Sequence, residues 1–218
     1  MKNKITTAIL CVCTVLLTIT FSIALPICVR PFYYAHIEKY NLVELTGKTE
    51  AQIKEAYNQV LDYLTLPNKD FSTGDFIYSE EGKNHFVDCK VLFTLNFAVL
   101  FISLAVIILL IVLKRKNIIE FSKPFSLNPS FTSGLSTLLL FVIIGLVAAI
   151  DFDKAFVVFH NIFFYGKDNW MFDSQQDELI LALPQEFFLN CGILIVASII
   201  IISLCLIINA IIKKIKSK

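Results

Sequence analysis

Two of the three histidines in the 218-residue chain, His85 and His160, lie at the edges of long apolar stretches. An imidazole titrates near neutral pH, so it can take a proton from one reacting group and give it to another. His85 precedes Asp88 by three residues, and the two share a helix face if a helix begins near Asn84. The positive end of that helix would favour the neutral imidazole. The spacing fits a general base, and it also fits a structural histidine at a membrane boundary.

Membrane-spanning helices are the elements that must position these side chains. The chain is 56% hydrophobic, contains 20 phenylalanines and is only 17% charged, which is too apolar for an ordinary soluble domain. Crossing the hydrocarbon layer takes about 20 apolar residues, and lipid offers no hydrogen-bond partner to a free backbone group. Four segments meet this requirement, at about residues 5–29, 91–113, 134–150 and 187–212. We therefore expect an all-α membrane protein, formed by a single integral membrane domain over residues 1–218.

The charged residues predict how these spans are oriented. The two termini and the middle loop carry ten of the 19 cationic residues and only Glu120 among the 18 carboxylates. By the positive-inside rule these regions are cytoplasmic. The loops 30–90 and 151–186 then face outward, and both boundary histidines lie on the extracytoplasmic side. The first apolar run is about 25 residues long, which exceeds the 7–15 of a signal-peptide core, so we expect it to be a retained anchor.

The first outer loop contains a helix signal. Thr49 and Gln52 fit a capping box, apolar residues then recur at helical spacing from Ile53 to Leu64, and Pro67 ends the pattern. The sequence predicts an amphipathic helix of about 15 residues here, and Asp173 with Gln176 can cap a short helix through Leu183 in the second outer loop. Both outer loops are thus expected to be partly helical and partly irregular. The amphipathic helix of the first loop either packs on the outer ends of the spans or lies on the lipid surface.

Known site motifs are scarce in the rest of the chain. The six cysteines form no CxxC pair, and no phosphate-binding loop, serine-nucleophile elbow or nucleic-acid-binding patch is visible. No cofactor is implied. Asp151 and Asp153 follow the third span, where the negative end of a helix disfavours anions. His160 is surrounded by aromatic residues, which are typical of the boundary between lipid and water.

Two long stretches carry a family resemblance. FSTGDFIYSEEGKNHFVDCKVLF and FHNIFFYGKDNWMFDSQQDELILALPQEFF resemble the lipoprotein intramolecular transacylases of Gram-positive bacteria, which are four-span membrane proteins. The resemblance covers nearly the whole chain and is strongest in residues 78–90 and 159–188. Cys89 departs from it, because a small aliphatic residue is expected after Asp88.

The resemblance implies a reaction and a set of residues. The partner would be a lipoprotein whose N-terminal cysteine carries diacylglycerol, embedded in the lipids of the bacterial cell membrane, with no obligate protein partner and no nucleic acid. The sn-2 acyl chain would move from glycerol to the cysteine's own α-amino group, which gives the lyso form. His85 and His160 are the implied catalytic residues. The residues themselves suggest supporting candidates, each with a structural alternative. Asp88 is an orienting group or a plain interfacial carboxylate, Tyr78 and Tyr165 are oxyanion donors or interfacial anchors, and Asp151 and Asp153 are ligands of the substrate ammonium or solvated carboxylates.

Two other classes of function remain open from the sequence. In one, His85, Asp88 and His160 bind a metal ion and the protein is a metal-dependent membrane lipid hydrolase. In the other, the chain is a non-enzymatic accessory or sensor protein of the membrane. Metal content separates the first from metal-free transfer, and unchanged lipoprotein N-termini in a His85→Ala strain would favour the second.

The orientation can be tested by labelling single cysteines in a cysteine-free background. Because residues 69 and 168 fall in the predicted outer loops, Lys69→Cys and Asp168→Cys should react with a membrane-impermeant thiol reagent in intact cells. Lys123→Cys, in the cytoplasmic middle loop, should not react until the membrane is broken. The reverse labelling pattern would contradict the outward-facing site.

Overall fold

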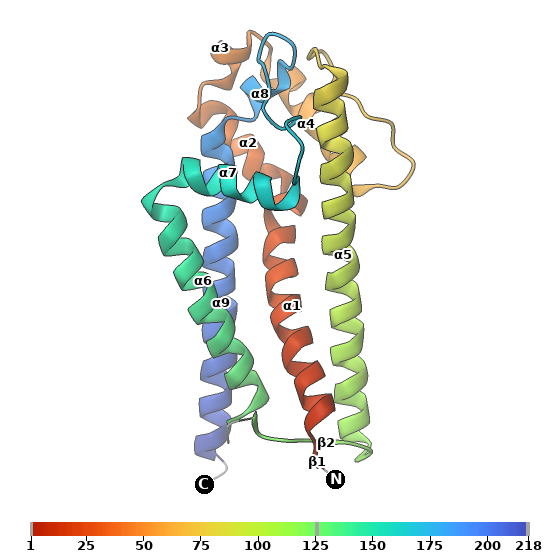
Figure 1. Cartoon of the computed structure of the whole chain (residues 1–218), viewed down its shortest axis with the longest axis vertical. Coiled ribbons are helices and arrows are strands. Elements are labelled where there is room, and N and C mark those ends of the chain that lie inside the picture. Colours follow the sequence, from red (N-terminus) through yellow and green to blue (C-terminus); the bar gives the residue numbers. More distant parts are fainter. Residues whose placement is uncertain (1, 125–126, 217–218) are drawn as a thin grey trace. The chain divides into compact units, whose positions relative to one another are not determined.

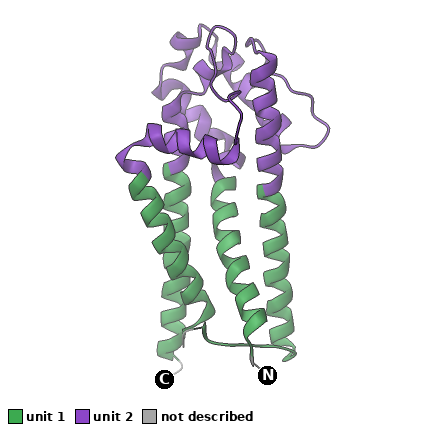
Figure 2. Cartoon of the chain, in the orientation of Figure 1, with its two compact units in different colours: residues 1–24, 96–147, 193–218 green, residues 25–95, 148–192 purple. Residues whose placement is uncertain are grey.

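The computed structural model describes residues 2–124 and 127–216, and most of these residues are helical (Figure 1). Two compact units emerge, unit 1 from residues 1–24, 96–147 and 193–218, and unit 2 from residues 25–95 and 148–192 (Figure 2). The elements in chain order are β1 (Lys2–Asn3), α1 (Lys4–Cys28), α2 (Arg30–Lys39), α3 (Leu42–Thr46), α4 (Glu50–Thr65), α5 (Glu80–Arg115), β2 (Glu120–Phe121), α6 (Pro129–Ile150), α7 (Phe152–Phe163), α8 (Leu179–Ala182) and α9 (Gln185–Lys216).

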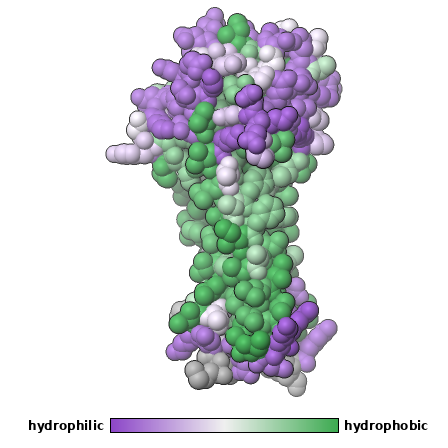
Figure 3. Space-filling model, turned by 90° about the vertical axis from the view of Figure 1, so that its right-hand side faces the viewer, coloured by the Kyte–Doolittle hydropathy of each residue, from purple (hydrophilic) through white to green (hydrophobic). Residues whose placement is uncertain are grey.

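Four of these helices are long and apolar enough to cross a membrane, as the sequence predicted. They are α1, α5, α6 and α9, with mean hydropathies of 2.5, 3.0, 2.5 and 3.1 in their most apolar windows. On the face shown in Figure 3, hydrophobic residues cover the middle stretch of the long helices, and hydrophilic residues gather at their lower ends. The all-α, four-span prediction is confirmed. The side of the membrane that each end faces stays a prediction of the charge pattern, and Lys218, one of the cations behind it, lies outside the described residues.

Unit 1 is held together by close helix contacts at small residues. A Cβ added to Gly134 of α6 would lie 2.8 Å from the Ser203 carbonyl oxygen of α9, so only glycine allows this approach. The Asn96 side chain of α5 donates to the Thr20 carbonyl oxygen of α1 at 3.2 Å. Small residues and interhelical hydrogen bonds are what drive helix association in lipid, where the hydrophobic effect is absent.

The loop between α5 and α6, which the charge pattern predicts to be cytoplasmic, contacts the N-terminal end of the chain in unit 1. The short strands β1 and β2 pair in parallel, with Lys2 opposite Glu120 and Asn3 opposite Phe121. The Asn3 side chain accepts a hydrogen bond from the Ile5 N–H at 2.9 Å, which caps the start of α1. The chain segment between α5 and α6 is therefore tied to the N-terminus.

Unit 2 confirms the predicted amphipathic helix as α4. Thr49 and Gln52 form the complete capping box at its start. The apolar face of α4 is buried, and Tyr57 stacks on Tyr33 of α2 with 3.7 Å between ring centroids. The Tyr33 hydroxyl donates to the Ala182 carbonyl oxygen of α8 at 2.7 Å. Of the two alternatives for α4, packing against the protein and lying on the lipid surface, the first is correct. The buried face of α4 forms the core of unit 2.

The glycine contact in unit 1 gives a stability prediction. Gly134→Leu should lower the free energy of unfolding of the purified protein by about 1–3 kcal/mol, because overpacking would separate α6 from α9. The melting temperature should fall accordingly. Gly192→Leu is the matched control, since a Cβ at Gly192 of α9 meets nothing within 4 Å. Thermal unfolding in one detergent checks both variants. Equal melting temperatures for the two would show that the close approach is not needed.

Candidate active site

His85 is positioned by the way α5 begins. The Ser79 hydroxyl accepts a hydrogen bond from the Gly82 N–H at 2.9 Å, which caps the helix. The buried Asp177 carboxylate accepts from the Ser79 N–H at 2.8 Å and from its hydroxyl at 2.9 Å. A Cβ at Gly82 would lie 2.1 Å from Asp177 Oδ1, so glycine is required there. This contact between residues 98 positions apart fixes the turn of α5 that carries His85.

His160 lies on α7, and Asp151 fixes the start of that helix. The Asp151 carboxylate accepts from the Lys154 N–H at 3.0 Å and forms an ion pair with the Lys154 ammonium at 2.9 Å. These contacts, the backbone hydrogen bond first, lower the pKa of Asp151. The sequence predicted this carboxylate at the C-terminal end of the third span, and α6 does end at Ile150. A new helix also begins at Phe152, however, and Asp151 is its N-cap, where an anion is favoured.

The two imidazoles come together within unit 2. Their ring centroids lie 6.0 Å apart, with 30° between the ring planes. Both side chains are buried, His85 with 6% and His160 with 7% of the residue exposed. Lone histidines at a boundary have no reason to meet, so their pairing favours a shared role.

Aromatic rings enclose the pair. Phe164 meets the His85 ring edge to face at 4.7 Å, and Phe172 does so at 5.4 Å. Trp170 stacks on His160 at 4.5 Å, and Phe156 tilts against it at 4.2 Å. These four residues, Phe156, Phe164, Trp170 and Phe172, form an aromatic cage that covers most of both imidazoles.

The hydrogen bond of His160 defines its tautomer. Its Nδ1 lies 2.7 Å from the Phe156 carbonyl oxygen, which can only accept. Nδ1 therefore carries the proton, and Nε2 is left with a free lone pair. Burial lowers the pKa of His160, and the hydrogen bond to Phe156 opposes part of that shift. The ring is consequently neutral at pH 7 and able to accept a proton at Nε2.

His85 has a different set of polar neighbours. Its Nε2 lies 3.4 Å from the Cys89 sulfur, and its Nδ1 is buried without a hydrogen-bond partner among the described residues. The Asp88 carboxylate, which the sequence suggested as the orienting group, binds the Lys167 ammonium at 2.5 Å and the Asn169 amide at 3.2 Å. Asp88 thus interacts with the loop that follows α7, and makes no direct hydrogen bond to His85 in the part of the chain that the structure describes.

The remaining sequence candidates lie apart from the imidazoles. Tyr165 is 90% exposed, and Tyr78 packs edge to face against Phe71 at 5.0 Å. Asp153 accepts a hydrogen bond from the Gln185 amide at 2.6 Å. Among residues 2–124 and 127–216, no group of three or more His, Cys, Asp and Glu side chains is placed to hold a metal ion. The three-ligand set that the hydrolase alternative requires is not assembled in this part of the chain.

Several site residues were missed by sequence reasoning. Asp177, Gly82 and Asn169 carry no periodic signal, because their partners are distant in the chain. Trp170 and Phe164 were expected only to lie at the boundary between lipid and water, as aromatic residues near His160. Since the aromatic cage is built from one helix and one irregular loop, only the folded chain shows it.

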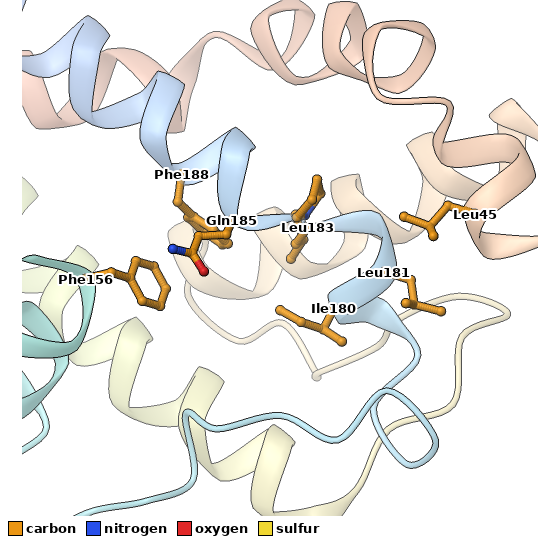
Figure 4. A pocket seen from close by; sticks show the side chains of 8 residues that line it. Leu45, Phe156, Ile180, Leu181, Leu183, Gln185 and Phe188 are labelled. Carbon is orange, nitrogen blue, oxygen red and sulfur yellow. The ribbon is translucent and has the colours of Figure 1, made fainter. Parts of the chain in front are cut away.

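An apolar pocket adjoins α7. It has a volume of about 300 Å³, and its walls come from α3, α7, α8 and the start of α9 (Figure 4). Phe156 belongs both to this pocket and to the aromatic cage around His160. The lining residues are Leu45, Phe156, Ile180, Leu181, Leu183, Pro184, Gln185 and Phe188. Walls of this composition fit a hydrocarbon chain and not a charged ligand.

Comparison with solved structures identifies proteins of the same fold. The membrane-integral lipoprotein intramolecular transacylase Lit of Bacillus cereus superimposes with a TM-score of 0.85 and 24% identity, over 98% of this chain and 97% of that one. An H85R variant of the same protein matches with a TM-score of 0.79 and 22% identity, covering 98% and 94% of the two chains. An H85A variant matches at 0.77 and 23%, covering 96% and 94%. No curated protein sequence matches the chain.

A family model decides the relationship. The model described as lipoprotein intramolecular transacylase Lit matches residues 8–188, which is most of the chain. The stretches quoted above lie inside this range. The match and the fold agree, and the chain belongs to the lipoprotein intramolecular transacylase family, whose members are acyltransferases of the membrane.

Proposed function

We propose that this protein moves the sn-2 acyl chain of a diacylglyceryl-cysteine lipoprotein to the α-amino group of the same cysteine. The observation that carries the proposal is the buried pair of imidazoles, 6.0 Å apart, in a chain of this family. The charge pattern predicts that the connections 30–90 and 151–186 face outward, and on that basis the site lies on the extracytoplasmic side. The substrate is the lipidated N-terminus of a membrane-anchored protein.

The chemistry needs proton transfer more than it needs a nucleophile. Ester and amine belong to one molecule, and holding them in a reactive pose can supply effective molarities of about 10⁵–10⁸ M. The amine attacks the ester carbonyl carbon, the carbon–oxygen bond to glycerol breaks, and an amide and an alcohol result. The acyl group passes directly to nitrogen, so no acyl-enzyme forms.

The proton balance explains why two bases are useful. An α-amino group has a pKa of about 7.7–8 and reaches the site mostly as an ammonium ion. It loses two protons on the way to the amide, of which one goes to the leaving glycerol oxygen and one to water. His85 takes the proton that the ammonium loses before attack and gives it to the leaving glycerol oxygen. The free Nε2 of His160 takes the proton released on attack, which then passes to solvent. Positioned bases and acids of this kind contribute about 10²- to 10⁴-fold to a rate.

Burial of the imidazoles also protects the reaction. Water at the site would hydrolyse the ester and waste the acyl chain. The aromatic cage excludes water, which strengthens the interaction of the imidazoles with the developing charges. The apolar pocket beside Phe156 offers space for one hydrocarbon chain of the substrate.

Replacement of the two site histidines tests the function. His160→Phe should lower formation of the lyso form by about 10²- to 10⁴-fold, because a ring of similar size remains but the base is lost. His85→Ala should do the same. The readout is mass spectrometry of lipoprotein N-terminal peptides from cells that make each variant.

The matched control is the third histidine. His36 lies on α2 and contacts the Phe32 carbonyl oxygen at 2.6 Å, the same four-residue contact that His160 makes. His36→Phe removes that contact in the same way and should keep activity. Normal product from the His160→Phe strain, or loss in all three variants at equal protein levels, would overturn the assignment.

The protonation state of His160 gives a second prediction. Because burial lowers its pKa, the ring should lose its proton at a pH below the ordinary histidine value of about 6.5. The neutral form then predominates at pH 7 and gives way to the imidazolium only as the pH falls through the lowered value. Nitrogen NMR of ¹⁵N-histidine protein in bilayers, titrated from pH 8 to 4, measures this midpoint. A midpoint at or above 6.5 would contradict a buried, neutral base.

A further inference from the structure

Two buried polar atoms without partners lie in the candidate active site. Within the described residues, three buried side-chain polar atoms have no hydrogen-bond partner, and two of them are His85 Nδ1 and Asn169 Oδ1. An unpaired buried polar atom is uncommon and calls for an explanation. Asn169 is hydrogen-bonded to Asp88, which lies three residues after His85 on α5, and it precedes Trp170, which stacks on His160 at 4.5 Å. Its Oδ1 makes no hydrogen bond to His85 Nδ1 in the structure. The unpaired Asn169 Oδ1 can therefore accept a hydrogen bond from His85 Nδ1, if Nδ1 carries the ring proton.

Asp88 determines which end of the Asn169 amide faces which neighbour. An ionised carboxylate only accepts hydrogen bonds, so the amide must present its NH₂ group to it. Asn169 Nδ2 indeed donates to Asp88 Oδ2 at 3.2 Å. The Lys167 ammonium at 2.5 Å from the other oxygen keeps Asp88 ionised and in place. The free end of the amide is consequently the carbonyl oxygen, which accepts and cannot donate.

We infer that Asn169 is a positioning residue that holds His85 in one tautomer. Its carbonyl oxygen accepts the Nδ1 proton of His85, so that Nε2 keeps the lone pair and serves as the base. Asp88 acts on His85 through Asn169, not directly. The inference rests on the proposed function in giving His85 Nε2 a proton to accept.

The Cys89 contact agrees with this tautomer. With Nδ1 protonated, the Cys89 thiol donates to Nε2 across their 3.4 Å separation. A thiol is a weak hydrogen-bond donor, and the ammonium group of the substrate is a strong one. The substrate can therefore displace the thiol and deliver its proton to Nε2. In the opposite tautomer the Nε2 proton points at the sulfur, and no lone pair is available to the substrate.

The unmodified protein provides the first test. Nitrogen NMR of the full-length ¹⁵N-histidine protein in bilayers at pH 8 distinguishes protonated from bare ring nitrogens, and His36→Phe and His160→Phe spectra assign the His85 signals by elimination. The inference predicts a protonated Nδ1 and a bare Nε2 in His85. A bare Nδ1 would overturn it. Because no substrate is present, this result does not depend on whether the proposed reaction is correct.

Variants of Asn169 provide the second test. Asn169→Ala should shift His85 toward the other tautomer and lower kcat for acyl transfer about 10- to 100-fold, with KM nearly unchanged, as for partners that orient metal-bound imidazoles. Asn169→Asp keeps an acceptor for Nδ1. Its charge should favour the protonated imidazole and move the acid limb of the pH–activity profile to higher pH.

The control removes an amide from the same loop. Gln176→Ala loses an exposed amide whose contact is with Asp173 at 3.4 Å, and it should leave both the His85 tautomer and kcat unchanged. Wild-type tautomer and kcat in Asn169→Ala would overturn the inference, as would an unshifted pH profile in Asn169→Asp. If His85→Ala transfers acyl chains normally while the His85 tautomer still depends on Asn169, the proposed function fails and the positioning contact stands.

Discussion

The hydrogen bonds from Ser79 to the Asp177 carboxylate are the contact on which the rest of the site depends. They join the start of α5, which carries His85, to the loop that follows α7, which carries the rings around both imidazoles. A buried carboxylate requires such donors, because an unpaired charge in a dry environment is costly. Gly82 is part of the same constraint, since any Cβ there would collide with Asp177. Movement at this joint would separate His85 from its neighbours.

The site combines two demands that ordinarily conflict. Proton transfer needs titratable groups, and protection of an ester from hydrolysis needs the absence of water. Two neutral imidazoles inside an aromatic cage meet both demands, because a neutral ring tolerates burial far better than a charged one. The Phe156 carbonyl fixes the tautomer of His160, and in the inferred arrangement the Asn169 carbonyl does so for His85. Fixed tautomers mean that no rearrangement of ring protons precedes the reaction.

Much of this architecture could be predicted from the sequence, and the reason is local periodicity. The four spans are long apolar runs, and a capping box followed by apolar residues at helical spacing predicts α4. The importance of His85 and His160 came from the family resemblance and not from spacing, which left a structural role open. Both the Asp177–Ser79 and the Asn169–Asp88 contacts join residues about 80 to 100 positions apart, and no local pattern encodes such pairs. The capping role of Asp151 was missed for a related reason, since the start of a new helix at Phe152 leaves no mark in the apolar run.

Direct transfer from oxygen to nitrogen within one molecule is the central claim of the account, and a substrate with a blocked amine tests it most directly. A diacylglyceryl peptide whose α-amino group is acetylated presents the same sn-2 ester but no acceptor. The purified protein in lipid should convert the unblocked peptide to the lyso form and leave the blocked peptide intact. Steady release of fatty acid from the blocked peptide, or an acylated side chain on the protein, would contradict direct transfer and favour a hydrolase or an acyl-enzyme.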